Sequence, residues 1–250
     1  MLRVRGLTVG YGGEPVIDGV DLDLEAGRFA SLIGPSGSGK TSILRVVTSL
    51  VQPLHGSVEL DVDGRDIGFL FQDDALLPWR TVRQNVTLGL KIRDVASGDA
   101  DTQADDWLTR LGLEGLGDRY PGQLSGGQRK RVAIAQVLAL SPKLLLMDEP
   151  FAALDAIVRT RITQDLLDWV EREQLTVLLV THDLEEAISV SDEVHVLGQG
   201  PRATIRARHA IDIPRPRNVL EVRRHPDFGP LLQTLWDELA GEVVEEGFAT

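Results

Sequence analysis

Cysteine is absent from the 250 residues of this sequence, and aromatic residues make up only 5% of it. The absence of cysteine excludes a disulfide framework and every metal site built on thiolates. No apolar run approaches the roughly 18 residues that a membrane-spanning helix needs, so we expect the chain to serve any membrane process from the aqueous side. Residues 1–5 alternate apolar and basic side chains, which predicts a strand and not a secretion signal.

Positive charge is also in short supply. The formal net charge is −12, which argues against a general nucleic-acid-binding protein, because such proteins need a basic surface that neutralises phosphates. Residues 201–226 nevertheless hold seven arginines against two acids, and residues 227–250 hold six acids and no base. We interpret both stretches as solvated surface, with a contact face for a partner or a lipid headgroup layer as the alternative.

Apolar patterns along the chain predict an α/β fold, because short apolar runs alternate with helical ones. The runs at residues 28–33, 144–147 and 177–180 are typical of parallel strands that are covered on both faces. Residues 2–9 and 20–24 alternate apolar and polar side chains, as antiparallel strands with one exposed face do.

The middle and the end of the chain follow other patterns. Residues 81–140 contain no good strand pattern, and we predict that they are helical. A helix is also predicted over residues 41–50, a strand over 194–197 and a final helix over 227–239.

The turn after residue 33 reads Gly34-Pro35-Ser36-Gly37-Ser38-Gly39-Lys40-Thr41, with Ser42 next. It matches the pattern G-x-x-x-x-G-K-[ST] between a strand and a helix, and the alternative is a chance match in a glycine-rich turn. The glycines let several backbone N–H groups point into one concavity, and the helix start adds partial positive charge. Lys40 can reach the β- and γ-phosphates and Thr41 can ligate Mg²⁺. The turn therefore predicts nucleotide binding.

A second motif is an apolar stretch from Lys143 to Met147 that ends in Asp148 and Glu149. A strand that ends beside the phosphate-binding loop would deliver Asp148 to Mg²⁺. Glu149, one residue further on, could act as the general base that polarises an attacking water. The alternative is a pair of solvated acids at a strand end, and the loop upstream favours the functional interpretation.

A third motif is Leu124-Ser125-Gly126-Gly127-Gln128, which precedes a helical run. A serine hydroxyl and glycine N–H groups at a helix start form a second anion site; the alternative is a serine N-cap with a glycine turn. This motif is the signature of ABC ATPases, and with it the chain resembles the ATP-binding subunits of ABC transporters.

The resemblance implies a P-loop NTPase (RecA-like) core with an N-terminal antiparallel β-subdomain and an inserted helical subdomain. It divides the chain into an ABC ATPase domain over residues 1–226 and a C-terminal helix with an acidic tail over residues 227–250. Within the first part, the core covers residues 1–80 and 141–226, and the helical insert covers residues 81–140.

The resemblance also implies roles for single residues. Tyr11 matches the aromatic residue that stacks on adenine, and Gln72 matches the glutamine that contacts Mg²⁺ and the attacking water and senses the membrane partner. Ala153-Leu154-Asp155 matches a loop that communicates across a dimer, and His182 matches a histidine that contacts the γ-phosphate. The implied catalytic residues are then Glu149, His182 and Gln72, and the implied Mg²⁺ ligands are Thr41, Gln72 and Asp148.

Partners follow from the same resemblance. In the family the signature faces the ATP of another chain, so a second copy sandwiches two ATP molecules. Residues 76–82 and 213–217 are similar to those of the nitrate, sulfonate and taurine importer subfamily. This implies import of a small solute, transmembrane permease subunits, an indirect solute-binding protein and a peripheral place at the cytoplasmic face of the membrane. Nucleic acid is not expected, and the sequence does not identify the solute.

Two further alternatives bear on this interpretation. A soluble ABC ATPase that acts on DNA or ribosomes would share the same sites, but such proteins usually carry two cassettes, a long coiled coil or zinc-binding cysteines. An inactive homologue would need a lost catalytic residue. The apolar run Leu76-Leu77-Pro78-Trp79 is expected to be a contact site for the membrane partner, with packing inside the helical insert as the alternative.

Overall fold

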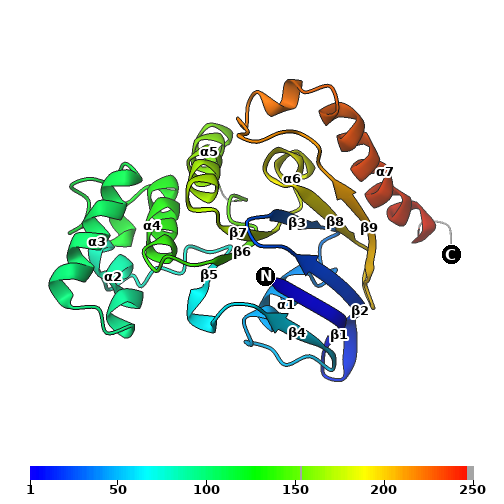
Figure 1. Ribbon diagram of the computed structural model, residues 1–250, viewed down its shortest axis with the longest axis horizontal. Helices are drawn as coiled ribbons and strands as arrows, with labels where there is room; N and C mark the ends of the chain where they lie inside the picture. Colours follow the sequence, from blue (N-terminus) through cyan, green and yellow to red (C-terminus); the bar gives the residue numbers. More distant parts are fainter. Residues whose placement is uncertain (153, 247–250) are drawn as a thin grey trace.

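The computed structural model of the chain describes residues 1–152 and 154–246, which form two sheets with helices around them (Figure 1). The smaller sheet is antiparallel in the order β2-β1-β4. Its strands are β1 (Leu2–Tyr11), β2 (Glu14–Leu24) and β4 (His55–Leu60). Val20, Leu22 and Leu24 are buried whereas Asp21 and Asp23 are exposed, which confirms the predicted alternation.

The larger sheet has the strand order β5-β6-β7-β3-β8-β9. Its neighbours are parallel except at the edge, where β9 runs antiparallel to β8. The strands are β3 (Phe29–Ile33), β5 (Ile67–Leu70), β6 (Leu144–Asp148), β7 (Thr176–Val180), β8 (Glu193–Leu197) and β9 (Ile205–Ala210). Every residue of β3, β6 and β7 is buried, as predicted. Because parallel strands end at the same edge, the loops that follow β3, β6 and β7 meet there.

Helices cover both faces of this sheet. They are α1 (Lys40–Val47), α2 (Val82–Ile92), α3 (Ser97–Arg110), α4 (Gly126–Leu138), α5 (Ala156–Glu173), α6 (Leu184–Val190) and α7 (Phe228–Glu246). The described chain also contains short 3₁₀ turns: η1 (Gly64–Asp66) before β5, η2 (Pro121–Gln123) before α4 and η3 (Val222–Arg224) before α7. Helices α2, α3 and α4 stand together beyond the β5 edge (Figure 1), which confirms the helical prediction for residues 81–140.

Three apolar clusters hold these layers together. One lies between the small sheet, α1 and one face of β3, β6 and β7. A second covers the opposite face and extends through α4 and α5 into α2 and α3. The third packs α6 and α7 against β8. Within the part of the chain that the structure describes, no helix combines the length and apolar character that crossing a membrane requires.

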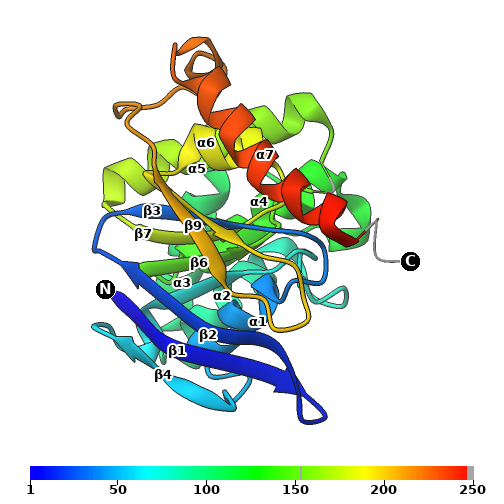
Figure 2. The same ribbon diagram turned by 90° about the vertical axis from the view of Figure 1, so that its right-hand side faces the viewer.

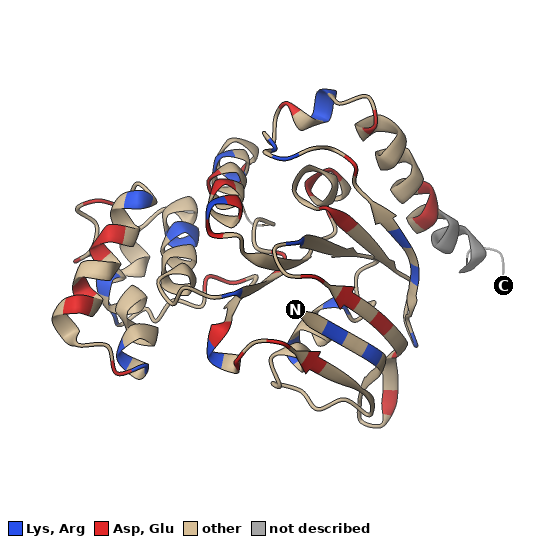
Figure 3. Ribbon diagram, viewed as in Figure 1, with Lys and Arg blue, Asp and Glu red and all other residues tan. Residues whose placement is uncertain are grey.

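The C-terminal segment returns along the outside of the molecule. Helix α7 runs obliquely across the front of the second view (Figure 2), and it begins near the predicted residue 227 but continues to Glu246. His209 on β9 lies 2.9 Å from a carboxylate oxygen of Glu238, which fastens the helix to the edge strand. Acidic residues occur on β2, α3, α5 and α7 alike (Figure 3).

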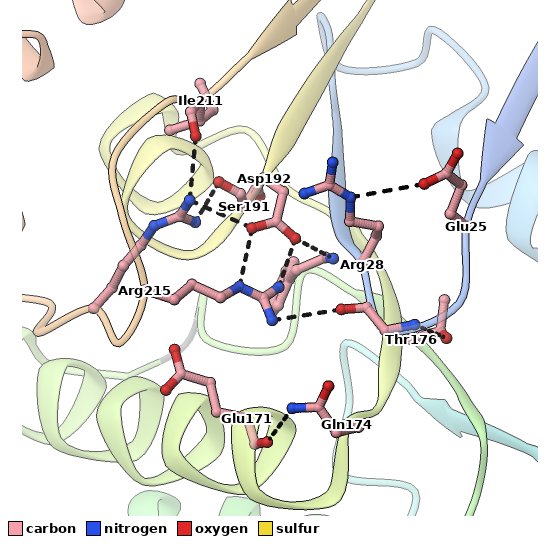
Figure 4. Close-up of polar contacts among 12 residues, drawn as sticks. Glu25, Arg28, Glu171, Gln174, Thr176, Ser191, Asp192, Ile211 and Arg215 are labelled. Atoms are coloured by element: carbon pink, nitrogen blue, oxygen red, sulfur yellow. Dashed lines mark hydrogen bonds and ion pairs between the residues drawn. The ribbon is translucent and has the colours of Figure 1, made fainter.

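The arginines of residues 201–226 are not all solvated. Asp192 accepts a hydrogen bond from the Phe29 N–H at 2.9 Å and forms an ion pair with Arg217. It also forms an ion pair with Arg215 (Figure 4). The Arg217 side chain is only 3% exposed and donates to the backbone oxygens of Ser191, Ile211 and Ile213. The interpretation of this stretch as solvated surface is therefore wrong for Arg217, because its guanidinium satisfies carbonyls at the base of the sheet.

Candidate functional site

The phosphate-binding loop joins β3 to α1, with the first helical residue at Lys40. Gly37 and Gly39 have φ values of 82° and 95°, in the left-handed region that favours glycine. A Cβ atom on Gly34 would lie 2.6 Å from the Leu197 carbonyl oxygen. These three glycines are therefore required by the backbone path of the loop, as the sequence pattern predicts.

Lys40 is folded back over this loop. Its Nζ donates to the carbonyl oxygens of Gly34 and Pro35, both at 2.8 Å. Burial lowers the pKa of the Lys40 ammonium, and the charges of Glu149 and Asp148 oppose that effect. Ser38 Oγ is buried and makes no hydrogen bond to any residue that the structure describes. The loop thus holds a cation and a hydroxyl without a partner, two groups that can bind phosphate oxygens.

Asp148 and Thr41 meet at the edge where the parallel strands end. The Thr41 hydroxyl donates to Asp148 Oδ1 at 2.9 Å, although the two residues are far apart in the sequence. Burial raises the pKa of Asp148, whereas the hydrogen bond from Thr41 lowers it. Both oxygens are hard donors of the kind that Mg²⁺ prefers. Among residues 1–152 and 154–246, no group of three or more histidine, aspartate or glutamate side chains is arranged to hold a metal ion.

Glu149 and His182 face each other beside this pair. Glu149 has a φ of 43°, which is uncommon for a residue with a Cβ atom, and its N–H donates to the Val180 carbonyl at 2.9 Å. His182 follows β7, and its Nδ1 lies 3.0 Å from Glu149 Oε2. The His182 side chain is 59% exposed, so a ligand in the loop can reach it.

Tyr11 and Gln72 flank the site from two other strands. Tyr11 ends β1, and its hydroxyl lies 3.0 Å from Ser42 Oγ at the start of α1. The residue is 47% exposed, so its ring is available for stacking. Gln72 follows β5 and its side chain is exposed. The Gln72 carbonyl oxygen accepts a hydrogen bond from Lys130 Nζ at 3.0 Å.

The signature motif caps helix α4. Ser125 Oγ accepts from the Gln128 N–H at 3.3 Å, and Gln128 Oε1 accepts from the Ser125 N–H at 2.9 Å, so the two residues form a capping box. A Cβ atom on Gly127 would lie 2.7 Å from Val158 Cγ1. Ser125 is thus a serine N-cap, the structure that the sequence offered as the alternative to an anion site. The same helix start also presents backbone N–H groups.

The signature and the phosphate-binding loop lie apart in the same chain. Helix α4 stands on the far side of β5 from α1 (Figure 1). Asp155 caps α5 by accepting from the Val158 N–H at 3.0 Å, and Ala153 of the same loop lies outside the described residues. The structure therefore brings together the residues from Gly34 to Ser42 with Asp148, Glu149, His182 and Tyr11, but not with Ser125.

Trp79 lies at the surface, with 71% of it exposed. Packing inside the helical insert is therefore the wrong interpretation for Trp79, whereas Leu76 does pack against the core cluster that includes these helices. A cavity of about 300 Å³ lies between β5 and the helices α2 and α4. Its lining includes Phe71, Leu88 and Ile92, which are close to Trp79 in the sequence.

Sequence reasoning missed three side chains around the site that carry buried polar atoms. Lys130 Nζ forms an ion pair with Asp74 at 3.1 Å although its side chain is only 3% exposed. Arg159 and Glu186 each carry a buried atom without a partner in the described chain. The spacing of Lys130 from Ala133 and Ile134 places it on the buried face of α4, which is a signal that the sequence did contain.

Comparison with known proteins agrees with this geometry. Residues 17–152 match the model of the ABC transporter family. The chain is 43% identical over 206 residues to a taurine import ATP-binding protein, TauB, of Escherichia coli O157:H7, which covers 80% of this chain and 81% of that protein. It is 40% identical over 225 residues to a bicarbonate transport ATP-binding protein, CmpC, of Synechocystis sp.; the match covers 87% of this chain but 34% of CmpC. The chain thus spans about a third of the length of that relative.

Solved structures give the same result. A dimeric bacterial ABC transporter cassette, MJ0796, matches with a TM-score of 0.76 and 32% identity, over 86% of this chain and 100% of that one. The protein cbiO1 of Clostridium perfringens, part of the transporter complex cbiONQ, matches with a TM-score of 0.75 and 27% identity, over 98% of both chains. These likenesses confirm the predicted fold class, a P-loop NTPase core that carries an antiparallel sheet and a helical insert.

Proposed function

The chain belongs to the ABC transporter family, and on that premise we propose that it is the ATP-binding and ATP-hydrolysing subunit of an importer for a small solute. One observation carries the proposal: the Glu149–His182 contact of 3.0 Å stands beside the Thr41–Asp148 hydrogen bond of 2.9 Å at the mouth of the phosphate-binding loop. A base, a phosphate site and a candidate cation site therefore share one strand edge.

The residues present fit Mg²⁺. Thr41 and Asp148 supply two hard oxygens that already meet, and a cation would stabilise the ionised form of a carboxyl group that burial disfavours. Thr41, Asp148 and, from its exposed position after β5, Gln72 would hold the ion. When bound, it neutralises charge on the phosphates.

Nucleotide recognition is assigned to the loop around Lys40. Lys40 turns from the Gly34 and Pro35 carbonyls toward the β- and γ-phosphates, and the buried Ser38 hydroxyl gains a partner. The backbone N–H groups of residues 34–42 surround the phosphates, and the exposed ring of Tyr11 stacks on the adenine.

Hydrolysis is assigned to Glu149, with His182 and Gln72 in support. Glu149 accepts the proton of the attacking water, because its carboxylate lies at the strand edge beside the phosphate site. His182 exchanges its contact with Glu149 for one with the γ-phosphate, which its exposure permits. The exposed amide of Gln72 orients the water from the neighbouring strand.

A second copy of the chain completes the site. Because the signature lies apart from the loop of its own chain, Ser125, Gly126, Gly127 and Gln128 would meet the phosphates held by another chain. Asp155, exposed at the start of α5, lies in that contact. The dimeric state of the MJ0796 cassette supports this arrangement.

The remaining partners are transmembrane permease subunits at the cytoplasmic face of the membrane and, through them, a solute-binding protein. The cavity beside Phe71 and the exposed Trp79 form the docking surface for the permease. The names of TauB and CmpC support a small solute of the kind that those proteins import or transport.

The test is ATP hydrolysis by the purified chain in the presence of Mg²⁺. Glu149→Gln should retain ATP binding and lose about 10²–10⁴-fold in turnover, because an amide cannot accept the proton. Glu25→Gln is the matched control, since that side chain is 84% exposed and belongs to a salt bridge away from the site. Near-normal turnover of Glu149→Gln would refute the assignment.

A further inference from the structure

Two buried polar atoms without partners belong to residues that contact the sequence neighbours of His182. They are Glu186 Oε1 and Arg159 Nε, and the third such atom in the described chain is Ser38 Oγ of the loop itself. Glu186 is only partly buried as a residue, but its Oε1 is out of contact with solvent. Unpaired buried groups are costly, so their recurrence beside the catalytic edge points to a function.

Glu186 holds the turn that carries His182. Its Oε2 accepts a hydrogen bond from the Thr181 hydroxyl at 2.5 Å, and Thr181 Oγ1 in turn accepts from the Asp183 N–H at 3.1 Å. Thr181 and Asp183 are the two neighbours of His182 in the sequence. The carboxyl group of Glu186 therefore fixes the backbone on both sides of the histidine.

Arg159 connects this turn to helix α5. Its Nη1 donates to Asp183 Oδ2 at 3.2 Å, and its Nη2 donates to the Leu154 carbonyl at 3.1 Å. Leu154 immediately precedes Asp155, the N-cap of α5. Contacts thus run without a break from Glu186 through Thr181, Asp183 and Arg159 to the segment before Asp155.

The charge on Glu186 depends on its surroundings. Burial raises the pKa of Glu186 to about 7, and Asp183 adds to the rise, whereas Thr181, Arg159 and His182 oppose it. Glu185, the next acidic neighbour, is engaged in an ion pair with Arg223 at 3.1 Å. The Glu186 carboxyl group is neutral in mildly acidic solution and ionised in alkaline solution.

We propose that Glu186 and Arg159 form a positioning pair, each holding one sequence neighbour of His182, that sets His182 relative to Glu149 and links it to the segment before Asp155. While Glu186 is neutral, Arg159 is held by Asp183 and Leu154. Ionisation places a full charge close to Arg159, whose Nε–H has no other partner, and draws the guanidinium away from Leu154. The inference rests on the proposed function, since it concerns the residues that support hydrolysis.

The experiment compares the pH dependence of kcat and KM for ATP between the wild-type chain and Glu186→Gln, from pH 5.5 to 9. The amide keeps the neutral, hydrogen-bonding state at every pH. We expect equal kcat near pH 6 and a wild-type kcat about tenfold lower than that of Glu186→Gln at alkaline pH, because misplaced catalytic groups lose rate. The midpoint should lie near the pKa of Glu186, and KM should agree within about twofold.

Glu185→Gln is the matched control, because the same substitution one residue away removes an exposed carboxylate. The ratio of its kcat to that of the wild type should stay constant from pH 5.5 to 9. If the same kcat ratio for Glu186→Gln is also independent of pH, the proposal is overturned. Arg159→Lys provides an independent variant. It keeps the charge but loses the two Nη donors that reach Asp183 and Leu154, so it should lower kcat about tenfold with little change in KM.

A second readout does not require turnover. In ¹⁵N-labelled protein, the backbone amide resonances of Thr181 and Asp183 should titrate near pH 7 in the wild type and not in Glu186→Gln. If these amide resonances titrate but the chain does not hydrolyse ATP, the proposal about the pair is supported and the proposed function is refuted. Amides that titrate alike in both proteins would overturn the pair and leave the proposed function standing.

Discussion

At the scale of the residue, backbone conformation places the candidate base. Glu149 has a φ of 43°, and its N–H is held by the Val180 carbonyl at 2.9 Å. A left-handed residue directly after β6 turns the chain sharply, so the Glu149 side chain meets His182 and does not continue along the strand. Such a conformation costs free energy at a residue with a Cβ atom, which is consistent with a position that serves chemistry.

The stability of the chain should depend on pH through Glu186. The pKa of this carboxyl rises from 4.5 to about 7 on folding, so between these values the folded state binds more protons than the unfolded state. Raising the pH through this window therefore lowers the free energy of unfolding, by about 3 kcal/mol at most. Denaturant midpoints at pH 5 and pH 8 should differ less for Glu186→Gln than for the wild type. Glu185→Gln is the control, and its midpoints should differ between the two pH values as much as those of the wild type. The same difference in Glu186→Gln would contradict the prediction.

Single residues of the site differ in how well the sequence predicts them. Lys40, Thr41 and Asp148 could be placed from motifs alone, because a strand–loop–helix pattern fixes their geometry. Arg159 and Glu186 could not, since a charged residue on a helix is normally solvated. Their burial depends on how α5 and α6 pack around the turn at His182, which no local pattern encodes.

At the scale of the element, short strands were the hardest to predict. β5 spans only Ile67–Leu70 and contains Gly68, where a Cβ atom would lie 2.6 Å from Val137 Cγ1. The glycine is needed because α4 packs closely, yet it weakens the strand pattern. β2 begins at Glu14, six residues before the predicted start at Val20, because Gly12 and Gly13 form a tight turn that lets it pair with β1 at once.

The segment after β5 carries the prediction about the membrane partner. Trp79→Ala should leave the melting temperature within about 2 °C, because exposed side chains contribute little to stability. It should reduce co-purification with co-expressed transmembrane subunits of the transporter, since exposed aromatic residues anchor interfaces. Leu220→Ala, at a residue that is 60% exposed, is the control. Undiminished co-purification of Trp79→Ala would place the docking surface elsewhere.

At the scale of the whole molecule, the separation of signature and phosphate-binding loop decides the assembly. ATP that bridges two chains stabilises the dimer by mass action. The Glu149→Gln chain should therefore be mainly monomeric without nucleotide and shift toward a dimer with ATP, as measured by light scattering. Ser125→Arg should abolish the shift because it places bulk and charge at the contact.

Thr102→Arg provides the control for that experiment. Thr102 is exposed on α3 of the same group of helices, so the substitution adds equal bulk away from the signature. It should leave the ATP-dependent change in mass intact. A Glu149→Gln chain whose mass never responds to ATP would count against the two-chain arrangement.

Asp74 forms ion pairs with Arg129 at 3.3 Å and with Lys130 at 3.1 Å, and Lys130 also donates to the carbonyl of Gln72. These contacts join the loop of Gln72 to the helix of the signature, so a shift of one segment would be transmitted to the other. Thermodynamic reciprocity then applies: a permease that shifts the loop and changes the affinity of the signature for nucleotide by some factor has its own affinity changed by nucleotide by that same factor. Cargo loading and ATP occupancy would report on each other through three charged side chains.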